Sequence, residues 1–221
     1  MYKLSAAKKI TYFSVLTALT FVLQLVGNTV KIGFVTLNFS LIPIVLAAII
    51  LGAFYGAALG VITGLIILFN NGILGADGFT NVLFASEPVM ITLVCILKTG
   101  VAGLLSGLIF KALRNKNSLA AVFIASAIVP VINTALFIVG MLCITGALTS
   151  AGFIANAESA FYTIVIVFVG LNFVFEFAVN VIVAPTLFRV ITVIDPSFKK
   201  TASADYNIDI DDNTDHSDGE N

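Results

Sequence analysis

The sequence has few charged residues and a single histidine. Asp, Glu, Lys and Arg make up 10% of its 221 residues, whereas an ordinary soluble domain contains about 25%. The histidine, His216, lies in a polar segment near the C-terminus, which excludes a histidine proton relay or histidine metal site in the apolar part of the chain. The two cysteines, Cys95 and Cys143, lie in apolar runs without partners at metal-ligand spacing. We interpret both as small core residues and expect no metal site.

The usual signatures of catalysis are missing as well. The chain contains no Walker motif, no paired-aspartate pattern of the kind found in prenyl- or phosphate-transferring membrane enzymes, and no nucleophile beside a base. We therefore expect no enzyme activity, no cofactor and no ATP hydrolysis by this chain itself. No internal repeat is evident, which argues against a secondary transporter built from inverted repeats.

What the sequence does contain is apolar surface. Hydrophobic residues make up 59% of the chain, and the mean hydropathy is +1.10. A soluble domain of this size cannot bury so much apolar surface, so a soluble globular protein, a disordered chain and a nucleic-acid binder are excluded. The apolar runs are continuous rather than alternating, which favours membrane-spanning helices over a β-barrel. The sequence therefore predicts an all-α integral membrane protein lying in the lipid bilayer.

Six membrane-spanning helices are predicted from the apolar runs. The run from Phe39 to Phe69 has no charge and is too long for one crossing of about 20 residues. We divide it into two helices at the turn-like sequence of residues 51–56, and expect a loop at residues 70–86. We expect the first helix to be retained rather than removed as a signal peptide. The other helices are expected at residues 10–26, 87–113, 119–145 and 159–192.

The basic residues support this count. With six helices, nine of the eleven basic residues fall on one side, which the positive-inside rule assigns to the cytoplasm. With five helices, the cluster at residues 111–116 would face outward. We therefore predict a six-helix membrane domain over residues 1–196, with both termini cytoplasmic. We expect residues 197–221 to form a disordered acidic tail, in which residues 201–221 carry seven of the twelve acidic residues and no lysine or arginine.

Small residues recur at helical spacing. Gly52, Gly56, Gly60 and Gly64 follow one another every fourth residue, and a similar pair stands at positions 103 and 107. Such spacing lets another helix backbone approach closely, so we expect these glycines to pack helices within the chain. The shorter pair Ser14 and Ala18 is compatible either with internal packing or with a partner protein.

Four polar residues in the apolar runs are candidates for a binding pocket. Lys98 and Glu176 are ionisable groups deep within predicted helices, where charge is costly unless it faces a cavity or a partner. Asn172 lies one helical turn before Glu176 on the same face, and Asn133 lies midway along the fifth predicted span. These groups can line one pocket; alternatively, Lys98 and Glu176 merely form an ion pair between helices. Gln24 is interpreted as a residue of the outer interface.

Three segments resemble one known family. The sequences LNFSLIPI at residues 37–44, LGAFYGAALG at 51–60 and PVINTALF at 130–137 resemble the substrate-binding S components of energy-coupling factor (ECF) transporters. The resemblance covers about residues 8–196. It implies a cell-membrane protein that binds a vitamin or similar micronutrient in a pocket open to the outside and capped by the loop after the first helix. It also implies a transmembrane coupling (T) subunit and two cytoplasmic ATPase subunits as partners.

The resemblance extends to individual residues. The coupling surface of the family uses small residues on the first helix, and Ser14 and Ala18 are the nearest match, with serine where the family often has alanine. Asn133 and Thr134 resemble pantothenate-type and uncharacterised S components. Lys98 suits a small carboxylate such as pantothenate, whose hydroxyl and amide groups can meet Asn133, Asn172 and Glu176.

Two other functions remain open at this point. One is a stand-alone secondary transporter of a small carboxylate, in which Lys98 and Glu176 couple transport to protons. The other is a structural or assembly membrane protein without a ligand.

Overall fold

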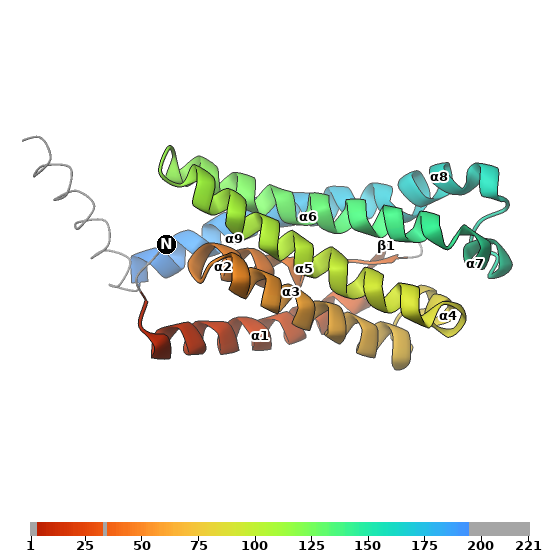
Figure 1. Ribbon diagram of the computed structural model, residues 1–221, viewed down its shortest axis with the longest axis horizontal. Helices are drawn as coiled ribbons and strands as arrows, with labels where there is room; N and C mark the ends of the chain where they lie inside the picture. The colour runs from red at the N-terminus through yellow and green to blue at the C-terminus, as the bar shows by residue number, and fades with distance from the viewer. Residues whose placement is uncertain (1–3, 33–34, 195–221) are drawn as a thin grey trace, which may run out of the picture.

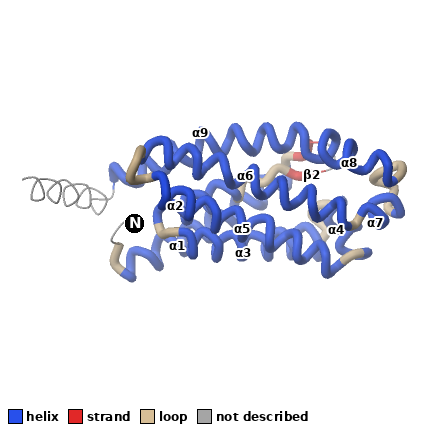
Figure 2. Tube along the Cα trace, turned by 45° about the horizontal axis from the view of Figure 1, so that its top comes forward, coloured by secondary structure: helices blue, strands red, loops and turns tan. Residues whose placement is uncertain are grey.

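The computed structural model describes residues 4–32 and 35–194. These residues form a bundle of helices with one small β-hairpin, whose strands β1 (Lys31–Ile32) and β2 (Val35–Thr36) pair antiparallel (Figure 2). The predicted acidic tail lies outside the described residues.

Within the described residues, five helical segments are long and apolar enough to cross a membrane, and a sixth apolar helix is short. Two of the five continue as π-helix: α3 runs into η1, and α8 leads through η3 into α9. The elements of these six are α1 (Ala6–Thr29), α2 (Leu41–Ile50), α3 (Ala53–Ile67), η1 (Leu68–Ile73), α5 (Pro88–Leu113), α6 (Ser118–Cys143), α8 (Ala160–Tyr162), η3 (Thr163–Val169) and α9 (Gly170–Ile194). Short helices between them are α4 (Gly78–Ser86), α7 (Thr145–Ser150) and η2 (Ala157–Ser159).

Local sequence explains where several helices begin. The side chains of Asp77 and Asn117 accept hydrogen bonds from the backbone N–H groups of Thr80 and Ala120, and so cap α4 and α6. Pro88 opens α5 at a position where its missing N–H costs nothing. The predicted spans at 87–113 and 119–145 are therefore confirmed to within two residues. The predicted loop at 70–86 is wrong in part, because η1 and α4 occupy most of it.

The break predicted at residues 51–56 is confirmed, but the two helices it separates are unequal. Gly52 has a φ of 112°, a conformation that favours glycine, and it therefore lies in the turn rather than in the glycine ridge of α3. The helix before it, α2, has 10 residues and is about 15 Å long, half the thickness of a bilayer core.

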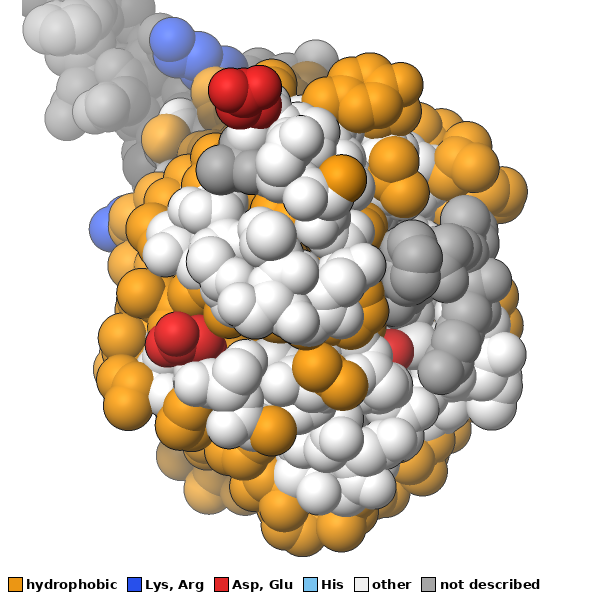
Figure 3. Space-filling model, turned by 90° about the vertical axis from the view of Figure 1, so that its right-hand side faces the viewer, with side chains coloured by type: hydrophobic (Ala, Val, Ile, Leu, Met, Phe, Trp, Pro, Cys, Tyr) orange, Lys and Arg blue, Asp and Glu red, His pale blue; other side chains and the backbone are white. Residues whose placement is uncertain are grey.

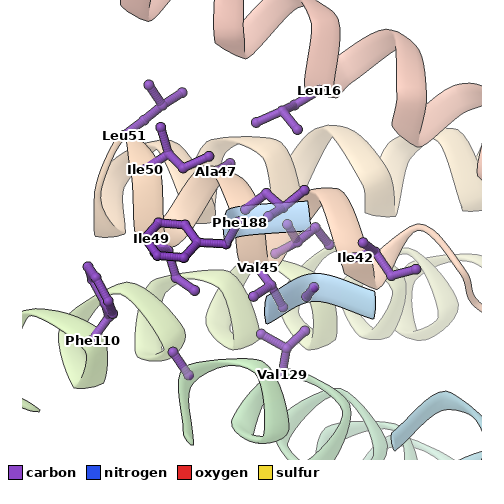
Figure 4. Close-up of a cluster of buried hydrophobic side chains, with 14 of the residues drawn as sticks. Leu16, Ile42, Val45, Ala47, Ile49, Ile50, Leu51, Phe110, Val129 and Phe188 are labelled. Atoms are coloured by element: carbon purple, nitrogen blue, oxygen red, sulfur yellow. The ribbon is translucent and has the colours of Figure 1, made fainter. Parts of the chain in front are cut away.

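The short helix α2 forms the centre of the bundle. All ten of its residues are buried, and it contacts α1, α3, α5, α6 and α9. Figure 4 shows Phe110 of α5, Val129 of α6 and Phe188 of α9 around the side chains of α2. An entirely apolar sequence, LIPIVLAAII, is suited to this position because it leaves no polar side chain to satisfy.

The two ends of the bundle differ in charge. The start of α1, the loop between α5 and α6, and the end of α9 lie at one end, while the hairpin, α4 and α7 lie at the other (Figure 1). The first, which we call the basic end, carries Lys8, Lys9, Lys111, Arg114, Lys116 and Arg189. The second, the hairpin end, carries Asp77, Glu87 and Glu158, and acidic side chains are visible on this face among hydrophobic ones (Figure 3).

Glycines join α3 tightly to α5. A Cβ added to Gly60 would lie 2.2 Å from the carbonyl oxygen of Thr99, and one added to Gly64 would lie 2.4 Å from that of Cys95. A Cβ added to Gly103 would lie 2.2 Å from the Gly56 carbonyl oxygen, and one added to Gly56 would lie 2.7 Å from that of Gly103. The prediction that the glycines pack helices within the chain is confirmed for these positions.

Candidate functional site

The polar residues of the membrane helices meet in one cavity towards the hairpin end. Its volume is about 60 Å³, room for about two water molecules. All five pocket residues predicted from the sequence line it: Lys98 of α5, Asn133 and Thr134 of α6, and Asn172 and Glu176 of α9. Further lining residues are Gln24, Thr36, Asn38, Ile67, Asn71, Asp77, Phe79, Thr80, Phe137, Phe168, Val169 and Phe173.

Lys98 contributes a positive charge to this cavity. Its Nζ lies 5.2 Å from the centroid of the Phe137 ring, within the range of a cation–π interaction. In the part of the chain that the structure describes, Lys98 and Glu176 form no direct ion pair. The structure therefore does not use this pair to tie two helices together, and the ammonium group is left for other partners.

Glu176 instead holds the segment that precedes α2. Its Oε1 accepts a hydrogen bond of 2.8 Å from the backbone N–H of Asn38, which is 138 positions earlier in the chain. Both groups are buried. A buried hydrogen bond to a carboxylate is among the stronger ones in proteins, so Glu176 attaches this wall of the cavity to α9.

A chain of hydrogen bonds extends from Asn38 to η1. The hydroxyl of Ser40 is within hydrogen-bond distance of Asn38 Oδ1 and of Gln24 Oε1. Gln24 Nε2 donates to Asn28 Oδ1, and Asn28 Nδ2 donates to Asn71 Oδ1 at 2.8 Å. Asn38 Oδ1 and Gln24 Oε1 cannot both accept the single hydroxyl proton of Ser40. In the flipped orientation of the Asn38 side-chain amide, Asn38 Nδ2 donates to Ser40 Oγ, and the Ser40 hydroxyl donates to Gln24 Oε1.

Asn133 presents a buried polar atom with no partner. Its side chain is 5% exposed, and its Oδ1 makes no hydrogen bond with any described residue. Such atoms are rare in folded proteins and need an explanation. Because Asn133 lines the cavity, a molecule within the cavity can supply the missing hydrogen bond.

One side of the cavity is aromatic. The ring centroids of Phe79 and Phe168 lie 5.1 Å apart, and those of Phe79 and Phe137 lie 6.5 Å apart. The cavity thus combines an ammonium group, carboxylates and amides with an apolar wall. This combination suits a small molecule that has both polar and apolar parts.

Sequence reasoning missed several lining residues. Gln24, interpreted from the sequence as a residue of the outer interface, is 2% exposed and lines the cavity. Its i, i+4 spacing with Asn28 in an apolar helix was an available signal. For Asn38 no local signal exists, because its partner on α9 is distant in the sequence.

The small pair on α1 and the cysteines lie elsewhere. Ser14 and Ala18 are both exposed on the outer face of α1, whereas Leu16 and Thr20 face the interior. Cys95 is a buried core residue as predicted, but Cys143 is exposed at the end of α6, so the core interpretation is wrong for it. No group of His, Cys, Asp and Glu within residues 4–32 and 35–194 is arranged to hold a metal ion.

A comparison with protein families gives one match. Residues 8–188 match the family model described as "ECF transporter, substrate-specific component". Comparisons with curated proteins and with solved structures give no match. The matched region contains every residue of the cavity.

Proposed function

We propose, from the premise that this chain belongs to the ECF transporter substrate-specific components, that it captures a vitamin or related micronutrient outside the cell. The chain is a multi-pass protein of the cell membrane, and its family is one of transporter components rather than enzymes. In the proposed mechanism it delivers its substrate together with a T subunit and two ATPase subunits.

We further propose six crossings, with the basic end in the cytoplasm. The clustering of basic residues at one end supports this orientation, and α2 then completes the second crossing together with the segment before it. A membrane-impermeant maleimide should label exposed Cys143 from outside intact cells, while buried Cys95 stays unlabelled. Labelling of Cys143 only after the cells are opened would contradict the orientation.

The substrate we propose is pantothenate. The observation that carries this proposal is Lys98, a cation in the cavity that is not paired with Glu176. A substrate carboxylate can pair with its ammonium group, and substrate amide and hydroxyl groups can meet Asn133, Thr134, Asn172 and Glu176. Because the cavity is smaller than the several hundred Å³ of typical ligand sites, binding requires its walls to move apart.

The test is a calorimetric titration of the purified protein with pantothenate. A hydrogen bond to a charged group contributes about 1.5–3 kcal/mol, so Lys98→Met should weaken binding by about 10- to 150-fold. Lys111→Met, which removes the same charge at the basic end of the same helix, is the matched control and should bind as the wild type does.

Three results would count against parts of this proposal. Equal affinity in the Lys98→Met variant and the wild type would remove the role of the ammonium group. If the protein binds another vitamin but not pantothenate, the proposed substrate is wrong, but the proposed function of vitamin capture still holds. Uptake by vesicles containing this chain alone, driven by a pH gradient, would instead favour a proton-coupled secondary transporter.

A further inference from the structure

A second concave site lies far from the cavity, at the basic end between α6 and α9. It is a groove with a volume of about 440 Å³. Its lining residues are Ser118, Leu119, Val122 and Phe123 of α6, and Pro185, Thr186, Phe188, Arg189 and Thr192 of α9. None of these residues lines the cavity described above, and none was predicted from the sequence as a site residue.

Apolar side chains form the larger part of the groove lining. Val122 and Phe188 are buried at its floor, while Leu119 is 60% exposed and Phe123 is 42% exposed. Small side chains, Ser118 and Thr186, stand where larger ones would fill the space. In a membrane, such a surface is in contact with lipid.

One rim of the groove is basic. Arg189 is exposed and lines the groove, and no ion pair holds it within the described part of the chain. The first turn of α6 also contributes unsatisfied backbone N–H groups, because the Asn117 cap serves only the N–H of Ala120. Lys116 adds positive charge just before the first turn of α6, whereas Asp77, Glu87 and Glu158 belong to the opposite end.

We propose that this groove binds one anionic phospholipid, with the phosphate at Arg189 and an acyl chain along Val122, Phe123 and Phe188. Basic pockets between membrane helices on the cytoplasmic side suit anionic headgroups. A soluble anion would gain no affinity from the apolar part of the groove, and an uncharged lipid would gain none from the basic rim. The two features together therefore match an amphiphile with a negative head. This inference rests on the proposed orientation of the basic end, but not on the proposed substrate.

The test is native mass spectrometry of the full-length protein in a nonionic detergent. Phosphatidylglycerol and phosphatidylcholine with identical acyl chains are added in turn. We expect the wild type to retain phosphatidylglycerol in preference to phosphatidylcholine. Arg189→Gln should weaken phosphatidylglycerol binding about fivefold, the effect of one basic residue near the headgroups, and leave phosphatidylcholine binding unchanged.

Two further variants make the test specific. Arg114→Gln removes the same charge at the same end but outside the groove, and should retain wild-type phosphatidylglycerol binding. Thr186→Trp fills the groove from its exposed rim and should lower the binding of both lipids. Both are surface changes, so the variants should elute from size-exclusion chromatography as the wild type does.

The proposal fails if the wild type shows no preference for phosphatidylglycerol. It also fails if Arg189→Gln and Arg114→Gln lower binding equally, because the effect is then a general one of charge. The alternative occupant that the experiment must distinguish is the acidic segment of residues 205–220. If replacing its Asp and Glu residues by Asn and Gln creates lipid binding that the wild type lacks, that segment rather than a lipid occupies the groove. Titrating the same variants with pantothenate tests the cavity separately, so a failure of the lipid proposal can be distinguished from a failure of the substrate proposal.

Discussion

The contact between α3 and α5 should not tolerate even one additional methyl group. In Gly60→Ala, the new Cβ would lie 2.2 Å from the Thr99 carbonyl oxygen, 2.6 Å from its carbonyl carbon and 2.8 Å from Gly100 Cα. All three atoms belong to the backbone, so no side chain can rotate away. Ordinary contact begins at 3.4 Å, and the helices would have to separate by about 1.2 Å, the difference between 3.4 and 2.2 Å.

The energetic cost can be estimated from this geometry. Overpacking of a tight contact costs about 1–3 kcal/mol. Separation would also stretch the 2.6 Å hydrogen bond from Thr99 Oγ1 to the Gly60 carbonyl oxygen, which is worth about 0.5–1.5 kcal/mol. Alanine is more stable than glycine within a helix by about 0.5–1 kcal/mol, which offsets part of this cost. We therefore expect Gly60→Ala to be destabilised by about 0.5–4 kcal/mol.

Unfolding by sodium dodecyl sulfate in mixed micelles, followed by circular dichroism, measures this difference. The matched control is Gly146→Ala in α7, where an added Cβ has nothing within 4 Å, so its stability should be unchanged or slightly raised. Because Lys98 precedes Thr99 on α5, Gly60→Ala should also weaken substrate binding. If the two alanine variants unfold at the same detergent fraction, the backbone contact does not limit the packing of these helices.

Two further predictions concern the cavity wall and the outer face of α1. Glu176→Ala leaves the Asn38 N–H without its acceptor, at a cost of about 1–3 kcal/mol, so hydrogen exchange of the peptide containing Asn38 should accelerate at least fivefold. The control Glu158→Ala removes an exposed carboxylate at the hairpin end and should leave this exchange rate unchanged. Equal exchange rates in the wild type and both variants would contradict the role of Glu176. Leucine at Ser14 and Ala18 should abolish co-purification with the T subunit without altering stability, because both positions are exposed; unchanged co-purification would show that the subunits meet elsewhere.

The helices were predictable because their signals are local. Apolar runs of sufficient length, the Asn117 cap and Pro88 are each readable within a few residues. The family match over residues 8–188 agrees with the resemblance drawn from three short segments. The glycine spacing predicted packing but did not identify α5 as the partner of α3, because a small-residue ridge accepts any helix that approaches it.

The cavity was predictable only in part. Scarcity of charge made Lys98 and Glu176 stand out, and helical spacing added Asn172. The hydrogen bond from the Asn38 backbone N–H to Glu176 was not predictable, because it joins residues 138 positions apart in the sequence. The inward position of Gln24 was missed because a glutamine near a helix end is equally compatible with an interfacial site.

A helical membrane protein with a basic end and few, costly charges within its apolar spans follows from the amino-acid composition and its order along the chain. Apolar surface and charge partition between lipid and water whatever the arrangement of the helices. Three features come instead from the folded arrangement: α2 is a short buried helix at the centre, Lys98 forms no direct ion pair with Glu176, and α6 and α9 leave a groove beside Arg189. These features depend on which helix faces meet, and close packing and hydrogen bonding between distant segments select those faces.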